Sequence, residues 1–74
     1  MNLLAGISGK EAIKKLQTLG YKVIRQKGSH VRLVHSKSDI FKPLTIPVHK
    51  ELKMGLLNQL IKDINLTIDE FLEL

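Results

Sequence analysis

The residues best suited to chemistry gather in one short segment, RQKGSHVRLVH at positions 25–35. His30 lies in this segment together with Arg25, Lys27 and Arg32. An imidazole has an ordinary pKa of about 6.5, so it can accept or return a proton near neutral pH. Cations beside it can stabilise negative charge on a phosphate. The segment therefore favours metal-free cleavage of RNA, in which the imidazole takes a proton from a 2′-hydroxyl or returns one to the leaving 5′-oxygen.

The same segment also has an ordinary structural interpretation. Residues 27–29 have the composition of a tight hairpin turn, and His30 would then be a surface residue on an exposed face of a sheet. Like charges close together destabilise a sheet, and the crowding of cations here is easier to understand if an anion binds among them. The crowding favours the functional interpretation without establishing catalysis.

Other catalytic chemistries find less support in the sequence. His30 and His35 are an odd number of positions apart, so on one strand they lie on opposite faces, and the chain has no Cys. Glu11, Asp39 and Glu51 are scattered, which disfavours a two-metal nuclease built from paired carboxylates. No glycine pattern of a nucleotide-binding loop is present. We therefore expect no metal site and no cofactor.

Positive charge is concentrated in the first two thirds of the chain. Residues 1–50 hold ten Lys or Arg and two acids, whereas residues 51–74 hold two Lys and five acids, which together give the net charge of +5. From Lys22 to Ser38 there are five cationic side chains, two histidines and no acid. This distribution favours a polyanion such as nucleic acid as the partner, although many small domains are basic for solubility alone.

The elements that must position these residues begin with a helix. Ser8 and Glu11 form a capping-box pattern, and Gly20 supplies a left-handed stop, so we expect a helix over residues 9–19. Its buried stripe is expected at Ala12, Ile13, Leu16 and Leu19.

A second helical pattern covers residues 50–64. Gly55 within it costs about 1 kcal/mol of helix propensity relative to Ala, which indicates close packing against another element. Asn65 is a plausible stop, and Thr67 begins a second capping box ahead of a short helix over residues 68–74. The buried stripe of the longer helix is expected at Leu52, Leu56, Leu57, Leu60, Ile61 and Ile64.

Between the helices the sequence predicts three strands. Residues 21–26 and 30–35 are alternating, β-branched segments on either side of a turn, and residues 41–48 form a third candidate. Pro43 and Pro47 cannot donate to a ladder, so we expect at least one side of the third strand to be an edge of the sheet.

Alternation decides which face of the hairpin is buried. In the second strand Val31 and Leu33 share one face, and His30 and Arg32 share the other. Burying Arg32 without a partner would cost several kcal/mol. We therefore expect His30 and Arg32 to point away from the helices.

The length of the hairpin loop decides what lies beside these outward residues. With a two-residue loop, either Lys27-Gly28 or Gly28-Ser29, Arg25 and Lys27 share the outward face and Ile24 faces the core. A three-residue loop would reverse this register. In either case Gly28 can adopt positive φ and lets a phosphate approach the backbone amides of the turn.

Length and composition set the remaining expectations. We expect residues 1–74 to form a single domain held by hydrophobic packing, without disulfides, as suits the reducing cytoplasm. The longest apolar run is far short of a bilayer span, so we expect no membrane association. The opening MNLLAGISGKE lacks a basic region and a long apolar region, so we expect no signal peptide.

Taken together, these segments resemble the HicA family of toxin endoribonucleases. The resemblance is carried by SGKE at the start of the first helix, LGY at its end, RQKGSH across the hairpin, IPVHKEL, and the GLL helix that follows. GSH alone would be a weak signal, but the ordered set is specific and covers nearly the whole chain, from Ile7 to the TIDEFLEL tail.

The resemblance implies an α+β fold like that of double-stranded-RNA-binding domains, α-β-β-β-α. Its three-stranded antiparallel sheet would carry the helices on one face, with a short extra helix at the C-terminal end. It also implies the toxin of a type II toxin-antitoxin pair, an mRNA interferase that cleaves messenger RNA without a metal. The partner would be an antitoxin of the HicB type that binds and masks the toxin.

The family's site residues carry over onto matching positions. His30 is the expected catalytic residue. His49 matches a second recurrent histidine, for which we expect a mostly structural role in orienting the start of the second long helix, with a part in catalysis as the less favoured alternative. Where the family commonly has Gly-Thr-Leu, this chain has Gly55, Leu56 and Leu57, which we interpret as a packing variation. The expected RNA-binding residues are Arg25, Gln26, Lys27, Gly28, Ser29 and Arg32.

Two other functions remain open at this point. A non-catalytic, double-stranded RNA-binding or regulatory module would use the same basic face only to grip phosphates, and its binding would be equally sensitive to salt. A DNA-reading protein is a third possibility, but the acidic C-terminal helix disfavours entry of that end into a groove.

Overall fold

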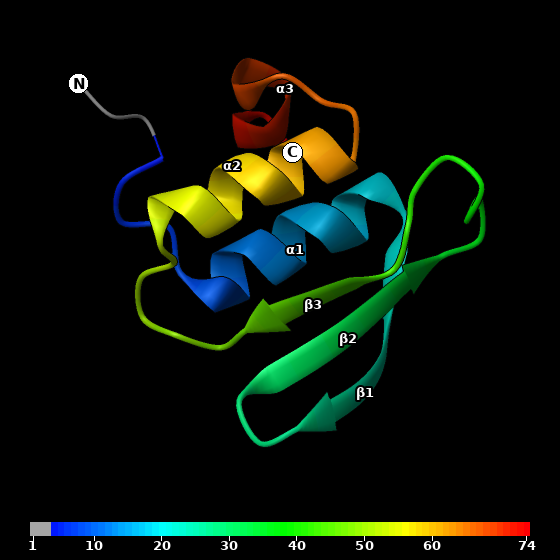
Figure 1. Ribbon diagram of the computed structural model, residues 1–74, viewed down its shortest axis with the longest axis horizontal. Coiled ribbons are helices and arrows are strands. Elements are labelled where there is room, and N and C mark those ends of the chain that lie inside the picture. Colours follow the sequence, from blue (N-terminus) through cyan, green and yellow to red (C-terminus); the bar gives the residue numbers. More distant parts are fainter. Residues whose placement is uncertain (1–3) are drawn as a thin grey trace.

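A computed structural model describes residues 4–74 of the chain. Residues 1–3 lie outside the described residues. They belong to the N-terminal segment for which the sequence predicts no signal peptide. The expected α+β order is confirmed (Figure 1): α1 (Gly9–Leu19), β1 (Tyr21–Lys27), β2 (His30–His35), β3 (Leu44–Pro47), α2 (Met54–Asp63) and α3 (Ile68–Leu72).

The helices pack on one face of a three-stranded antiparallel sheet with strand order β1-β2-β3. Figure 1 shows α1 and α2 side by side above the sheet, while the β1-β2 hairpin extends beyond them. Val31 and Leu33 face the helices and are buried, as the alternation predicts. The core that joins sheet and helices includes Ala12, Leu16, Val31, Leu33, Leu44, Ile46, Leu57, Leu60, Ile61, Ile64 and Phe71.

The ends of α1 are fixed by the residues that the sequence indicates. The capping box of Ser8 and Glu11 is present, and Gly20 adopts the left-handed conformation at φ 115°. Gly20 is also crowded, because a Cβ there would lie 2.6 Å from Nε2 of His35. Both its φ and this contact require glycine at the junction between α1 and β1.

His35 serves this junction as a structural residue. Its Nδ1 accepts from the backbone N–H of Lys37 at 3.0 Å, so its Nε2 carries the proton and donates to the carbonyl of Leu19 at 3.1 Å. The ring also packs against Tyr21 and Phe41, with ring centroids 5.1 and 4.4 Å away. Both ring nitrogens are thus occupied.

The start of α1 lies directly against the end of β3. A Cβ on Gly9 would lie 2.1 Å from the carbonyl oxygen of Pro47, so only glycine fits there. The N–H of Gly9 donates to the carbonyl of His49 at 2.9 Å, and the N–H of Leu52 donates to the carbonyl of Ile7 at 2.8 Å. The segment between β3 and α2 therefore runs along the start of α1, with a bend at Lys50 and Glu51.

This connection explains why α2 begins later than the expected residue 50. Its backbone is bonded to Gly9 of α1 through His49 and to Ile7, just ahead of α1, through Leu52. The first helical residue is Met54, preceded by Lys53 without a side-chain cap. The inference from Gly55 is wrong, because no atom outside its own helix turn lies within 4 Å of a Cβ built there. Asn65 ends the region with φ 59°, and the capping box at Thr67 is confirmed.

β3 is shorter than expected and forms one edge of the sheet, which confirms the inference from its prolines. Ile46 pairs with Val31, and the N–H of Val48 donates to the carbonyl of Ser29 at 2.6 Å, so these residues point their backbone groups toward β2. Because the direction alternates along a strand, the backbone N–H and C=O groups at positions 43, 45 and 47 point away from β2. Two of those three positions are prolines, and the outer edge of β3 offers a single backbone donor, that of Thr45.

Among residues 4–74, no helix is both long enough and apolar enough to cross a bilayer.

Candidate functional site

The hairpin turn consists of Gly28 and Ser29. Lys27 pairs with His30 across it, which selects one of the two loop alternatives that the sequence leaves open. Gly28 has φ 59° whereas Ser29 does not have positive φ, the combination of a type II′ turn, whose first central position suits glycine. Gln26 steadies the turn by donating from Nε2 to the carbonyl of Gly28 at 3.1 Å.

The register gathers the predicted cations on the face that points away from the helices. Lys27 lies opposite His30, and Arg25 lies opposite Arg32. Arg32 in turn lies opposite Thr45 of β3 and donates to its Oγ1 at 2.9 Å. These residues surround an open hollow of about 520 Å³, here called the basic hollow, lined by Arg25, Lys27, Gly28, His30, Arg32 and Thr45.

A β-bulge in β1 makes this arrangement possible. Val23 pairs with Leu33 and Arg25 pairs with Arg32, which leaves Ile24 without a partner. In a regular strand, residues two apart point to the same face, so Tyr21, Val23 and Arg25 would all share one face. The bulge allows Tyr21 and Val23 to lie on the face of the helices while Arg25 lies on the opposite face. After the extra residue, odd-numbered side chains of β1 point away from the helices instead of toward them.

The bulge also corrects the expectation for Ile24. This side chain does not face the core; it is 58 % exposed, because the bulge removes it from the ladder and Val23 takes its place opposite Leu33. The sequence holds the signal for this: the apolar positions Tyr21 and Val23 and the cationic positions Arg25 and Lys27 are all odd-numbered.

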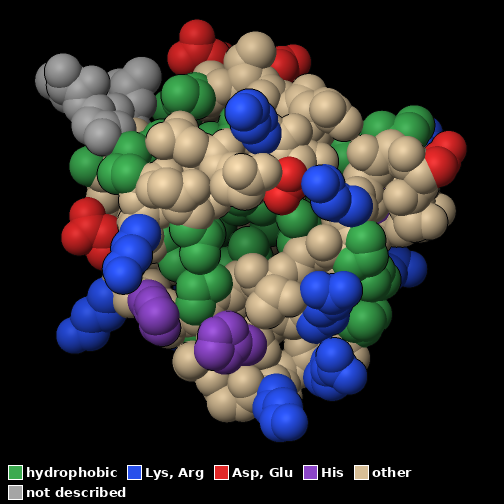
Figure 2. Space-filling view, viewed as in Figure 1, with side chains coloured by type: hydrophobic (Ala, Val, Ile, Leu, Met, Phe, Trp, Pro, Cys, Tyr) green, Lys and Arg blue, Asp and Glu red, His purple; other side chains and the backbone are tan. Residues whose placement is uncertain are grey.

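The side chain of His30 differs from that of His35 in its surroundings. The residue is exposed, and its side chain makes no hydrogen bond or ion pair with any residue from 4 to 74, in contrast to His35. Within the described part of the chain, no carboxylate lines the basic hollow. Figure 2 shows Lys, Arg and His side chains gathered in the lower part of this face.

Thr45 is the site residue that the sequence analysis missed. It orients the Arg32 guanidinium by accepting its hydrogen bond, and it comes from β3, which is remote from the hairpin in sequence. The only signal would have been its place between Pro43 and Pro47, at an outward position of an edge strand.

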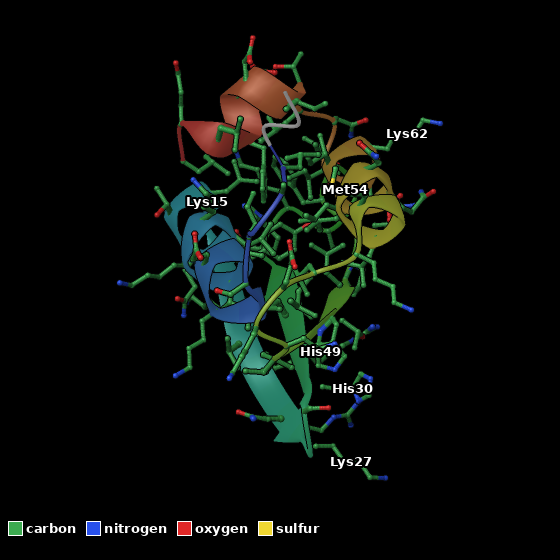
Figure 3. All side chains as sticks on the ribbon, turned by 90° about the vertical axis from the view of Figure 1, so that its left-hand side faces the viewer. Lys15, Lys27, His30, His49, Met54 and Lys62 are labelled. Atoms are coloured by element: carbon green, nitrogen blue, oxygen red, sulfur yellow. The ribbon has the colours of Figure 1, made fainter. Side chains whose placement is uncertain are left out.

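His49 lies on the same side of the molecule as His30 and Lys27 (Figure 3). Its side chain is exposed and forms no hydrogen bond within residues 4–74, so the expected role in orienting the second long helix is wrong for the side chain. The structural contact of His49 is made by its carbonyl, which accepts from Gly9 at the start of α1.

The described residues contain no group of three or more His, Asp or Glu side chains that could hold a metal ion. Two titratable groups outside the basic hollow have shifted pKa values. The pKa of Asp63 is lowered, chiefly by the hydrogen bond from Gln59 and also by Lys42. The pKa of Tyr21 is raised by its burial and by the negative charge of Asp63, while its hydroxyl donates to the carbonyl of Lys42 at 2.9 Å.

Comparison with known proteins identifies the family of this chain. No curated protein is similar to this chain. A family model, described as "HicA toxin of bacterial toxin-antitoxin", matches residues 9–66. The match spans α1, the whole sheet and α2, and it includes every residue that lines the basic hollow. The chain belongs to the HicA toxin family of bacterial toxin-antitoxin systems.

Proposed function

We propose that this toxin is a metal-independent endoribonuclease that cleaves messenger RNA at the basic hollow, with His30 as the general acid and base. The observation that carries the proposal is a reactive imidazole, without a partner among residues 4–74, at a hollow lined by Arg25, Lys27 and Arg32. A phosphate of the RNA would lie among these cations, and the exposed backbone of the turn at Gly28 would allow it to approach closely.

One imidazole suffices for the reaction. His30 accepts the proton of the ribose 2′-hydroxyl as its oxygen forms a bond to phosphorus, and the bond from phosphorus to the 5′-oxygen breaks. The same imidazole then returns the proton to the leaving 5′-oxygen, so the products are a 2′,3′-cyclic phosphate and a free 5′-hydroxyl. Arg25, Lys27 and Arg32 stabilise the charge that develops on the phosphorane oxygens.

The α-β-β-β-α layout supports an RNA partner, because double-stranded-RNA-binding domains share it. Family membership supports an antitoxin as the second partner. We infer that it is a HicB-type protein whose acidic residues cover the basic hollow, since a cationic surface recognises a surface of opposite charge.

The test is incubation of wild-type protein and His30→Ala with one RNA in the presence of EDTA. We expect the wild type to produce fragments despite the chelator and the variant to produce none. His30 is exposed and contributes little packing, so both proteins should unfold at the same temperature. A 2′-deoxy substitution at the cut site should block cleavage, because it removes the nucleophile.

Three results would contradict parts of the proposal. Cleavage by His30→Ala at the wild-type rate would remove His30 from the mechanism. Loss of wild-type activity in EDTA that returns with added metal would contradict metal independence. RNA that binds to the wild type and stays intact at every protein concentration would indicate the alternative, a non-catalytic RNA-binding or regulatory module.

A further inference from the structure

A second hollow lies beside the basic hollow, between the outer edge of β3 and α2. It measures about 420 Å³, within the range of roughly 300–1,000 Å³ that is usual for ligand pockets. Thr45 lines both hollows, so they form one continuous surface around the edge of β3. This second hollow, the β3-α2 groove, is lined by Pro43, Leu44, Thr45, Ile46, Leu56, Gln59, Leu60 and Asp63.

Five of the eight residues that line the groove are apolar, and Thr45, Gln59 and Asp63 are polar. Asp63 supplies the charged group among them, and one of its oxygens is a free acceptor. Both contacts of the Asp63 carboxylate are made by Oδ1, which accepts from Nε2 of Gln59 at 2.9 Å and lies 3.2 Å from Nζ of Lys42. Within residues 4–74, Oδ2 has no hydrogen-bond partner, and the side chain is 21 % exposed. A ligand in the groove would therefore find a fixed carboxylate oxygen that is able to accept a hydrogen bond.

We propose that the β3-α2 groove binds a nucleobase of the RNA, one that carries an exocyclic amino group, next to the phosphate held in the basic hollow. This inference rests on the proposed function, since it takes RNA as the substrate. A single RNA strand presents phosphates and flat bases with polar edges side by side, which matches a basic hollow continuous with a groove of mostly apolar lining residues and one carboxylate. Adenine, cytosine and guanine have an exocyclic amino group that can donate to Oδ2 of Asp63. Uracil can donate only from its ring N3–H, which lies between two carbonyl oxygens that a carboxylate repels.

The edge of β3 favours RNA over a protein strand as the occupant. A strand added to this edge would need successive backbone donors, but Pro43 and Pro47 leave Thr45 as the single outward donor of β3. Recognition along this edge therefore depends on side chains, and Figure 2 shows the apolar hollow opening directly above the cationic and His side chains.

The experiment measures binding of short, 2′-O-methylated oligocytidine and oligouridine by the wild-type chain. Methylation of the 2′-oxygen prevents cleavage, and a homopolymer offers the same base to the groove in every register. A hydrogen bond to a charged group corresponds to a preference of about tenfold, which we expect for cytidine. A strand of the same length without bases should bind more weakly than either.

Two variants and a matched control isolate the groove. Asp63→Asn should abolish the preference, because an amide can also donate to the carbonyl of uracil. Leu56→Trp, which fills the groove from a half-buried position, should weaken binding of both oligonucleotides toward that of the baseless strand. Asp69→Asn removes the same charge from α3 outside the groove, and it should retain the wild-type preference.

The possible failures are distinct. Equal binding of cytidine, uridine and baseless strands by a wild type that cleaves RNA would overturn this inference and leave the proposed function standing. Equal effects of Asp63→Asn and Asp69→Asn would overturn it as well. If the wild-type chain alone binds none of the oligonucleotides and cleaves no RNA, both the inference and the proposed RNA substrate are wrong.

Discussion

The two histidines of β2 show how one residue type serves two purposes within a single strand. His35 lies where β1 and α1 meet, with both ring nitrogens bonded and the ring packed against aromatic neighbours. His30 lies at the turn, exposed and without a side-chain partner among residues 4–74. The sequence could separate them, because alternation places them on opposite faces of the strand. It could not show that His35 is bonded, since its partners come from the end of α1 and the following turn.

At the residue scale, the basic hollow predicts a specific dependence on salt. Each phosphate contact with a single strand contributes about 0.7 to the slope of log K against log salt concentration. Replacement of one contacting cation, Lys27→Gln, should therefore reduce the magnitude of that slope by about 0.7 when binding of non-cleavable RNA is titrated.

Lys10→Gln is the matched control for this measurement. Lys10 is exposed on α1 and does not line the basic hollow, so its replacement should leave the slope at the wild-type value. Identical slopes for wild type and Lys27→Gln would mean that Lys27 does not contact a phosphate.

At the element scale, the boundaries of α1 and the turns were predictable because local side-chain chemistry specifies them. Ser8, Gly20 and Thr67 act through hydrogen bonds or backbone preferences within a few residues. The bulge at Ile24 and the late start of α2 were not predicted, because each depends on a partner distant in sequence. β1 contains an extra residue where it pairs with β2, and the segment ahead of α2 is held out of the helix by bonds of His49 and Leu52 to Gly9 and Ile7.

The close approach of α1 to β3 gives a prediction for stability. Gly9→Ala places a Cβ against the carbonyl of Pro47, so the free energy of unfolding should fall by about 1–3 kcal/mol. Gly55→Ala is the matched control, since a Cβ there meets no atom within 4 Å and the helix should gain about 0.5–1 kcal/mol.

Urea unfolding of the two glycine variants measures both effects. The midpoint should fall for Gly9→Ala and rise for Gly55→Ala, with the slope of free energy against urea unchanged. A midpoint for Gly9→Ala at or above that of the wild type would show that the helix start can move away from β3 without cost.

At the scale of the whole molecule, the two shifted groups predict how stability depends on pH. The folded-state pKa of Asp63 lies below 3.8, so its contribution is present above pH 3.8 and is lost as the pH falls through the folded-state value. The folded-state pKa of Tyr21 lies above 10.0, so its contribution is present below pH 10.0 and is lost as the pH rises through the raised value.

Thermal unfolding of wild type, Asp63→Asn and Tyr21→Phe across the pH range tests these signs. The acid-side loss of stability should be smaller in Asp63→Asn, and the alkaline-side loss should be smaller in Tyr21→Phe, because each variant lacks one titrating group. Parallel curves for wild type and variants at both extremes would show that neither group is coupled to folding.

The hairpin extends beyond the helices, so its tip residues and the buried residues of the core can change independently during evolution. Substitutions at the tip would alter the proposed recognition and cleavage of RNA, while the buried residues continue to hold the fold. A cell that escapes such a toxin by mutating the tip would accordingly keep a folded protein, and its hold on an antitoxin would depend on how much of the basic hollow remains. Variation at the tip would then proceed without passing through unfolded ancestors.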